Sequence, residues 1–235
     1  MSGIAYLQKG EGEDLLFLHG YLSNKEAWTA QTEYFSRFYR VTSIDIIGFG
    51  KSKPLPYAYS VDDYADWLQE VMQALKLSRP HLFAHSFGCR VAVKLSGRND
   101  ALFNKMLLTG PAGIIRPRTL KYKAKVKAYR VIKKFAPRYA ETHFGSEEYR
   151  SLSPLMKESY KKIVNEDLRP CAQRTTNSVL IVEGTKDAVT PIEEAKLYKE
   201  AFPHAEIIMV EGGHFAFAEN PVAFNLIAEE FLRGK

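Results

Sequence analysis

Cysteine is scarce in this chain, and several familiar signals are missing from it. Only Cys89 and Cys171 occur among the 235 residues, and neither stands at metal-ligand spacing from a histidine. No apolar run is long enough to cross a bilayer. The opening residues, MSGIAYLQKG, have no basic region followed by the apolar stretch of a signal peptide. We therefore expect a cytoplasmic protein with reduced cysteines, no disulfide framework and no metal site.

Nucleotide-binding signatures are missing as well. The segment SIDIIGFGKS contains Gly48 and Gly50 but lacks the third glycine of a dinucleotide fingerprint, and no Walker-type Lys-Ser/Thr pair follows a suitable loop. Asp45 opens this glycine-rich turn, and we interpret it as a structural loop aspartate that braces its surroundings. The sequence thus predicts no nucleotide cofactor.

Apolar runs of strand character alternate along the chain with amphipathic helical segments. The sequence predicts strands near residues 3–9, 14–19, 41–46, 81–85, 104–109, 178–184 and 206–211, and helices near 25–38, 61–76, 87–97, 191–202 and 221–233. The helix from Val61 has the clearest signals, because Ser60 and Asp63 form a capping box before its apolar face. This alternation predicts an α/β fold, with a mostly parallel, doubly wound sheet of about seven strands and helices on both faces.

Residues 112–170 interrupt the alternation. Lysines at every second position from Lys121 to Lys127 alternate with apolar residues at strand period, but alanine and lysine favour a helix, and we expect one over 119–135. A second helix should begin with Ser153 as N-cap and Pro154 as its first residue, and should run to about Leu168.

Positive charge is concentrated in the same segment. Residues 112–170 hold 15 Lys and Arg against 6 Asp and Glu, whereas the rest of the chain is slightly acidic. Two interpretations stay open: the charges form a solvated helix face, or they make a basic lid that attracts anionic acyl substrates or an anionic membrane surface. No known binding motif surrounds these residues, so a nucleic acid partner is not expected.

Ser86 stands where a buried strand must turn abruptly into a helix. In the segment LFAHSFG, Ala84 lies two residues before the serine and Gly88 two residues after it. Small residues at these places allow the strained turn that raises a hydroxyl above the sheet, which is the nucleophile elbow. The competing interpretation is an ordinary helix N-cap.

A serine hydroxyl needs a base to take its proton and an acid to orient that base. Asp187, in VLIVEGTKDAVTP, and His214, in AEIIMVEGGHFAFAENP, each follow an apolar run and precede a helix start. The expected helix starts are Thr190 with Pro191 and Asn220 with Pro221. Both candidates should therefore lie at the carboxyl ends of strands, the edge where open α/β sheets bind ligands. The alternatives are a turn-capping aspartate and a structural loop histidine.

The run LLFLHGY near the amino terminus ends a strand, and its backbone could stabilise the negative charge that develops during catalysis. Two fixed backbone N–H groups can stabilise the oxyanion that forms when a carbonyl is attacked, by about 3 kcal/mol per donor. Our candidates for this oxyanion hole are the N–H of Phe87, next after the nucleophile, and the N–H of Tyr21. His85, directly before the nucleophile, is expected to be structural and to point away from Ser86.

The segments HGY, DIIGFGKS, AHSFG, GTKDAVTP and GGHFAFAENP occur in this order, and with them residues 3–111 and 177–235 resemble the α/β-hydrolase fold family. The resemblance implies a core of residues 1–111 and 177–235, with a helical cap inserted at 112–176 over the active site. It also implies a triad of Ser86 as nucleophile, Asp187 as acid and His214 as base. Ala84 departs from the family's commoner first elbow glycine. The serine argues against the haloalkane dehalogenases and epoxide hydrolases of this fold, which use an aspartate.

The function implied is hydrolysis of a carboxylic ester or related small-molecule acyl compound through an acyl-enzyme, with no metal or organic cofactor. Trp28 and Phe215 are candidates for pocket walls that favour an apolar group, and each is equally explicable as a core residue. Carbon–carbon bond hydrolysis of a diketone-like metabolite is the alternative, and thioesterase, lactonase, peroxidase and lyase activities are also compatible. A slow-turnover ligand sensor on the same fold is the alternative from a different class.

Overall fold

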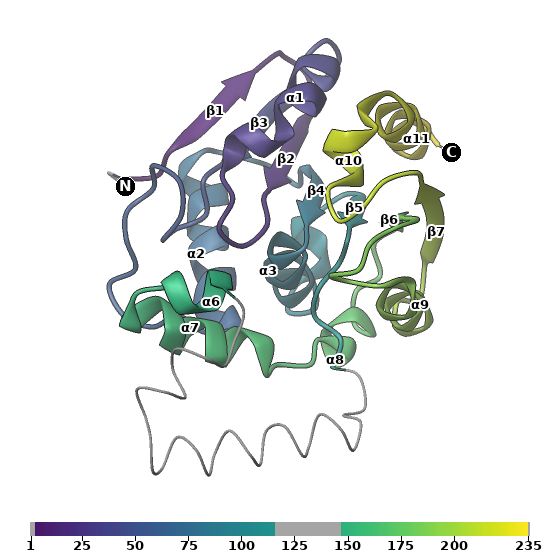
Figure 1. Cartoon of the computed structure of the whole chain (residues 1–235). Coiled ribbons are helices and arrows are strands. Elements are labelled where there is room, and N and C mark those ends of the chain that lie inside the picture. The colour runs from purple at the N-terminus through teal and green to yellow at the C-terminus, as the bar shows by residue number, and fades with distance from the viewer. Residues whose placement is uncertain (1–2, 116–146, 235) are drawn as a thin grey trace.

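The computed structural model describes residues 3–115 and 147–234. Within these ranges, a seven-stranded sheet runs through the molecule in the order β1-β3-β2-β4-β5-β6-β7 (Figure 1). Its strands are β1 (Tyr6–Lys9), β2 (Asp14–Leu18), β3 (Arg40–Ile44), β4 (His81–His85), β5 (Met106–Thr109), β6 (Val179–Gly184) and β7 (Ala205–Val210). β1 pairs antiparallel with β3, and all other neighbouring strands are parallel. The predicted mostly parallel sheet of about seven strands is confirmed.

The central strands are apolar on both sides because helices cover both faces of the sheet. Every residue of β4, HLFAH, and of β5, MLLT, is buried. One face packs against α2 (Val61–Ala74), α3 (Phe87–Ser96) and α9 (Ile192–Ala201), and the other against α1 (Thr29–Phe35) and α11 (Pro221–Arg233). Three short helices, η1 (Lys25–Trp28), η2 (Asp100–Leu102) and α10 (Ala216–Glu219), lie in the connections. This is the doubly wound arrangement that the alternation predicts.

Helix starts follow the sequence signals at three of the predicted caps and depart from them at a fourth. Asn220 stands at the N-cap position of α11 with Pro221 as the first residue, although its side chain makes no capping hydrogen bond. Ser60 and Asp63 form the expected capping box of α2. Ser153 accepts a hydrogen bond from the Met156 N–H, as an N-cap should. The prediction for Thr190 is wrong: α9 begins one residue later with Pro191 as its N-cap. The Thr190 hydroxyl donates to Asp187 instead, at 2.9 Å.

The segment between β5 and β6 contains α6 (Glu147–Ser151), α7 (Pro154–Val164) and α8 (Arg169–Ala172). The helix predicted over 119–135 falls outside the described residues. α7 ends at Val164 rather than near Leu168, and Asn165 forms its C-cap. Figure 1 shows α6 and α7 beside α2, at the end of the sheet where the loops after β2 and β4 emerge.

Polar contacts tie α7 to the core. The Arg90 guanidinium, on α3, donates to the carbonyl oxygens of Ile163 at 2.9 Å and Glu166 at 3.1 Å. The Ser159 hydroxyl and the Lys162 ammonium donate to carbonyls of the segment before α2, each at 2.7 Å. Carbonyls at the last turn of a helix lack partners within the helix. Arg90 therefore caps α7 and fixes it on the core.

Two further observations concern the membrane and the cysteines. Across residues 3–115 and 147–234, no helix combines the length and the apolar character needed to span a bilayer. Cys89 and Cys171 are both buried, and both are free thiols.

Candidate active site

Ser86 occupies a strained turn between β4 and α3. Its φ of 48° and ψ of −107° lie outside the ordinary regions for a residue with a side chain. Ser86 stands at the N-cap position of α3, yet its hydroxyl makes no capping hydrogen bond. A Cβ on Gly88 would stand 2.7 Å from the Leu18 carbonyl oxygen, so only glycine lets α3 approach β2 this closely. The backbone has the geometry of an elbow, and the interpretation of Ser86 as an ordinary N-cap does not fit.

Asp187 and His214 form a close pair. The Asp187 Oδ2 lies 2.7 Å from the His214 Nδ1, and the Asp187 side chain is fully shielded from solvent. The Asp187 Oδ1 accepts from the N–H groups of Val189 at 2.7 Å and Thr190 at 3.0 Å. Burial alone would raise the pKa of Asp187, but the hydrogen bonds from His214 and Thr190 outweigh it and hold that pKa well below its usual value. Asp187 is therefore an ionised carboxylate that both caps its own turn and orients the imidazole.

Glycines bring the two loops of this pair together. A Cβ on Gly184, at the end of β6, would stand 2.1 Å from the Gly213 carbonyl oxygen. The Lys186 N–H donates to the Gly212 carbonyl at 2.8 Å. Gly110, just after β5, has a φ of +51°, and a Cβ there would stand 3.0 Å from the His214 Nδ1. The chain thus passes close to His214 from three parallel strands, at their carboxyl ends, as the strand order predicts.

His85 connects the elbow to the His214 loop. Its Nε2–H donates to the His214 carbonyl oxygen at 2.9 Å, and the two rings lie 4.6 Å apart. Burial lowers the pKa of His85 to about 3, so the ring is neutral. The contact of the Ser86 hydroxyl with the His214 imidazole stays a prediction.

The loop after β2 lies against the nucleophile. A Cβ on Gly20 would stand 3.4 Å from the Ser86 Cβ. The His19 Nδ1–H donates to the Gly20 carbonyl at 2.7 Å, and the His19 Nε2 accepts from the Ile46 N–H at 2.9 Å. Because the C=O and N–H of a trans peptide point in opposite directions, this contact aims the Tyr21 N–H away from His19. The Tyr21 N–H thus projects from a loop fixed beside Ser86, which is what an oxyanion hole requires.

Asp45 braces this loop as the sequence suggests. Its carboxylate, which is buried, accepts from the N–H groups of Lys25 at 2.7 Å and Lys51 at 2.8 Å. Gly50 has a φ of +55°, and a Cβ there would stand 2.4 Å from the Asp45 carboxylate. The glycine-rich turn is therefore a cradle for Asp45.

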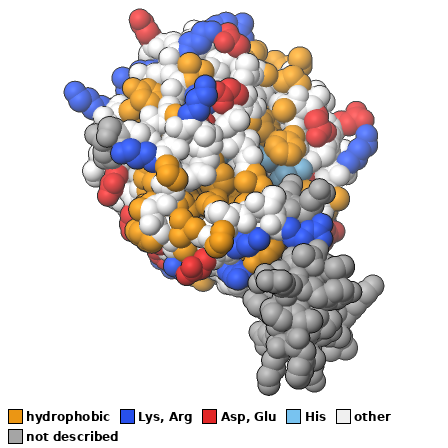
Figure 2. All heavy atoms as spheres, turned by 60° about the vertical axis from the view of Figure 1, so that its left-hand side comes forward, with side chains coloured by type: hydrophobic (Ala, Val, Ile, Leu, Met, Phe, Trp, Pro, Cys, Tyr) orange, Lys and Arg blue, Asp and Glu red, His pale blue; other side chains and the backbone are white. Residues whose placement is uncertain are grey.

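Tyr21 also reaches the insertion. Its hydroxyl donates to the Met156 carbonyl at 3.4 Å, and its ring lies 5.3 Å from that of Tyr160. The ring also lies 5.5 Å from that of Phe87. Figure 2 shows that hydrophobic side chains gather in the middle of the face on which α2 and the insertion come forward. Aromatic contacts thus run from the candidate oxyanion loop to α7.

Trp28 and Phe215, the two residues predicted to line a pocket, differ in their exposure to solvent. Trp28 is a core residue and the interpretation as a pocket wall is wrong: it is 0% exposed and stacks on Phe217 at 4.2 Å, beside Phe17. Phe215 is 44% exposed and lies 5.5 Å from the His214 ring. Phe215 therefore stays a candidate for substrate contact.

Among the polar residues around the pair, sequence reasoning missed Glu183, which lies buried at the end of β6. Thr190 binds Asp187 rather than capping α9, and His85 has the structural role that the sequence predicts, because it holds the His214 loop. Glu183 carried a local signal, because it is the single charged residue in the apolar run VLIVEG. Across residues 3–115 and 147–234, no cluster of three or more His, Cys, Asp or Glu could hold a metal ion.

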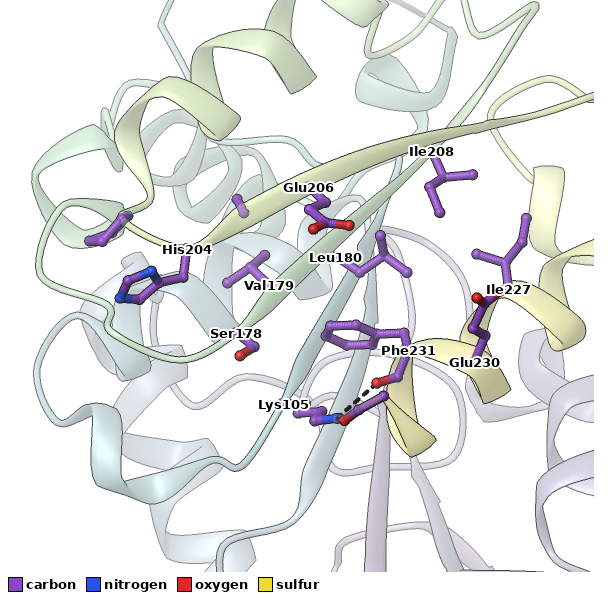
Figure 3. A pocket seen from close by; sticks show the side chains of 13 residues that line it. Lys105, Ser178, Val179, Leu180, His204, Glu206, Ile208, Ile227, Glu230 and Phe231 are labelled. Carbon is purple, nitrogen blue, oxygen red and sulfur yellow. Dashed lines mark hydrogen bonds between the residues drawn. The ribbon is translucent and has the colours of Figure 1, made fainter.

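A hollow of about 630 Å³ lies elsewhere on the molecule (Figure 3). It is lined by Ser178 and Val179 at the start of β6, by Glu206 on β7 and by Phe231 near the end of α11. Lys105 also lines it and is occupied in donating to the Phe231 carbonyl at 2.9 Å. This hollow lies at the amino ends of the strands, at the opposite edge of the sheet from Asp187 and His214.

Comparisons with known proteins agree with this geometry. The sequence profile of the alpha/beta hydrolase fold matches residues 15–170, and that of the TAP-like proteins matches residues 159–235. The (E)-2-((N-methylformamido)methylene)succinate hydrolase of Acinetobacter baylyi is 37% identical over 101 residues, which are 43% of this chain and 38% of that protein.

Two solved structures extend the comparison to the whole fold. An esterase of Exiguobacterium antarcticum has a TM-score of 0.78 at 23% identity, covering 98% of this chain and 96% of that one. A meta-cleavage product hydrolase of Pseudomonas fluorescens has a TM-score of 0.74 at 22% identity, covering 97% of this chain and 93% of that one. The first profile covers more than half of the sequence, and the fold agrees over nearly all of it. The chain therefore belongs to the alpha/beta hydrolase fold family.

Proposed function

We propose that this protein is a serine hydrolase that cleaves a carboxylic ester or related acyl compound through an acyl-enzyme intermediate, with Ser86, Asp187 and His214 as its triad. The observation that carries the proposal is the buried Asp187–His214 pair beside a strained elbow serine, since His85, the residue before Ser86, donates to the His214 carbonyl. A structural role alone would not need a carboxylate, an imidazole and a serine hydroxyl that does not cap its helix, all at one edge of the sheet.

The residues take distinct roles in the reaction. His214 accepts the Ser86 proton while Oγ forms a bond to the carbonyl carbon, and the N–H groups of Phe87 and Tyr21 stabilise the oxyanion. The bond to the leaving alcohol then breaks, and His214 gives that alcohol its proton. Water repeats the sequence on the acyl-enzyme and releases the acid. Asp187 stabilises the imidazolium during both steps.

We further propose that residues 112–176 form a cap over this site and that the substrate carries an apolar acyl or alcohol group. The Tyr21 contacts with Met156 and Tyr160 support the first part, because they join the candidate oxyanion loop to α7. The exposed ring of Phe215 beside His214 supports the second. The net positive charge of the insertion favours anionic substrates, because it attracts them toward the site. Lys162 is not free for this role, since its ammonium group donates to the Ala58 carbonyl and holds α7 on the core.

The first test is hydrolysis of p-nitrophenyl esters of graded chain length by the purified protein and by Ser86→Ala. We expect the variant to lose activity by several orders of magnitude, since the covalent route is gone. Ser178→Ala is a matched control, because Ser178 is an exposed serine at the opposite sheet edge, and it should retain full activity. The chain-length optimum would give the size of the pocket.

Other outcomes point to other functions. Equal and negligible rates for the wild type and Ser86→Ala would contradict a general esterase. Carbon–carbon bond hydrolysis of a diketone-like compound would then be tested, since a meta-cleavage product hydrolase shares the fold. Tight ligand binding with negligible turnover would identify a sensor.

A further inference from the structure

Glu183 is a buried carboxyl group without a good partner. It is the next-to-last residue of β6, lies four residues before Asp187, and is 0% exposed. Neither of its carboxyl oxygens makes a hydrogen bond of good geometry, although the Asp187 carboxylate and the Gly184 N–H lie nearby. Buried acidic side chains are rare unless they are paired, so this position needs an explanation.

The surroundings of Glu183 are unfavourable for a negative charge. The ionisable groups near it are the Asp187 carboxylate on its own loop, Glu194 on α9 and the Cys89 thiol on α3. The first two are acids, and burial raises the pKa of the Cys89 thiol well above its usual value. Burial, followed by the Asp187 charge, raises the pKa of Glu183 to about 9. Glu183 therefore holds a proton at neutral pH.

Asp187 has the opposite environment although it lies on the same loop. Its two oxygens accept hydrogen bonds from Val189, from the Thr190 N–H and hydroxyl, and from His214. These donors stabilise the Asp187 carboxylate, whereas neither Glu183 oxygen has a donor of comparable geometry. One carboxyl is thus kept charged and the other neutral, which is how paired acids with different roles are separated in active sites.

We propose that Glu183 is a positioning residue of the triad. As a neutral carboxylic acid beside Asp187, it leaves Asp187 as the single buried negative charge at the site. When Glu183 loses its proton, the enzyme becomes inactive. The catalytic part of this inference rests on the proposed function.

The shutdown has a physical cause. An ionised Glu183 would have to gain water or a cation, and the end of β6 would have to move to admit either. Asp187 is anchored to that strand end, because its N–H donates to the Gly184 carbonyl at 3.1 Å, so the Asp187–His214 alignment would move with it.

The experiment uses Glu183→Gln, which keeps the size and neutrality of the side chain but cannot titrate. The control is Glu206→Gln, an exposed strand glutamate on the neighbouring β7. For each protein, the Tm and the kcat/KM for p-nitrophenyl acetate are measured from pH 5 to pH 10.5, with the rate of Ser86→Ala subtracted. The chemical shift of the His214 imidazole is followed over the same range.

We expect the wild type to lose kcat/KM above about pH 9, by about tenfold per pH unit, whereas Glu183→Gln keeps its activity there. The Tm of Glu183→Gln should exceed that of the wild type by an amount that grows from pH 5 to pH 9 and then stays constant. The pKa of Glu183 is higher in the folded protein than in the unfolded chain, so across this window the native state holds a proton that the unfolded state has lost. The stability of the wild type therefore falls as pH rises, whereas that of Glu183→Gln does not change for this reason. A step in the His214 shift near pH 9 should vanish in Glu183→Gln and persist in Glu206→Gln.

Three results would overturn the inference. The first is a Tm difference that does not change with pH, and the second is an alkaline loss of activity that is the same in Glu183→Gln. The third is a change of the His214 chemical shift near pH 9 that the substitution leaves in place. If the wild type hydrolyses no ester at all, the proposed function fails, but the pH dependence of this chemical shift still decides the inference. Should Glu183→Gln fail to fold, Glu183→Met removes the same titration.

Discussion

At the scale of single residues, two buried histidines beside the candidate site keep one protonation state at neutral pH. His19 and His85 are neutral because burial lowers the pKa of the first to about 4 and of the second to about 3. Each donates from one ring nitrogen to a backbone carbonyl, Gly20 for His19 and His214 for His85. These two histidines therefore orient the backbone of the oxyanion loop and of the base without competing for protons.

A substitution of His85 tests this role. His85→Phe keeps an aromatic ring against Phe217 but leaves the His214 carbonyl without its donor. Losing a buried hydrogen-bond partner costs about 1–3 kcal/mol. We expect kcat to fall roughly tenfold or more with little change in KM, because the substrate does not touch His85. Steady-state kinetics of purified variants measure both constants.

Two further variants separate positioning from packing. His85→Gln retains an amide N–H that can reach the same carbonyl and should recover part of the lost kcat. His204→Asn changes an exposed histidine and should have no effect. A His85→Phe protein with wild-type kcat would contradict the positioning role.

At the scale of elements, the insertion is attached to the core through the ends of α7. Arg90 is 8% exposed and donates to the Ile163 carbonyl in the last turn of that helix and to the Glu166 carbonyl just after it. The Tyr21 hydroxyl reaches the Met156 carbonyl near the start of the same helix. α7 is therefore held at both ends, and its position relative to the oxyanion loop depends on Arg90.

Removing the Arg90 guanidinium should release this attachment. Arg90→Met preserves much of the side-chain volume but removes the donor of the Glu166 carbonyl and leaves the Ile163 carbonyl with only the N–H groups of Asn165 and Glu166. We expect a loss of about 1–3 kcal/mol in the free energy of unfolding and a higher KM for ester substrates. Denaturant unfolding and steady-state kinetics measure the two effects.

Arg98→Met is the matched control, because Arg98 makes exposed ion pairs with Asp62 and Asp66. Exposed pairs contribute about 0–1 kcal/mol, so this variant should stay close to the wild type. Equal stability losses for the two arginines would argue against a special role for Arg90.

At the scale of the whole molecule, the buried histidines His19, His81 and His85 link stability to pH. Burial lowers the pKa of all three below the usual value of 6.5, to about 4 for His19 and about 3 for His85. The unfolded chain therefore binds more protons than the native one below about pH 6.5, and stability falls as pH falls through this range. The lowered pKa of Asp187 adds to the loss only at more acid pH, near and below the usual range of a carboxyl group.

The expected result is a protein that loses stability between pH 6.5 and pH 4, most steeply below about pH 4.5. Each histidine contributes up to roughly 1.4 kcal/mol per pH unit to the slope, and Glu183 offsets part of it above about pH 4.5, because its raised pKa lets the native state hold an extra proton there. Urea unfolding at pH 7, 6, 5 and 4 measures the free energy, and His85→Phe should show a shallower slope because one of the buried histidines is gone. A wild-type stability that is constant from pH 7 to pH 4 would contradict this account.

The sequence determined the order of strands and helices, the elbow at Ser86, and the places of Asp187 and His214 on loops after strands. These features depend on local periodicity, turn residues and caps, which neighbouring residues specify. Tertiary structure decided the rest. Trp28 lies in the core rather than in a pocket, Thr190 binds Asp187 instead of capping α9, and His85 turns toward the His214 loop. Each of these outcomes depends on which distant segment packs against the side chain, and local sequence does not encode that packing.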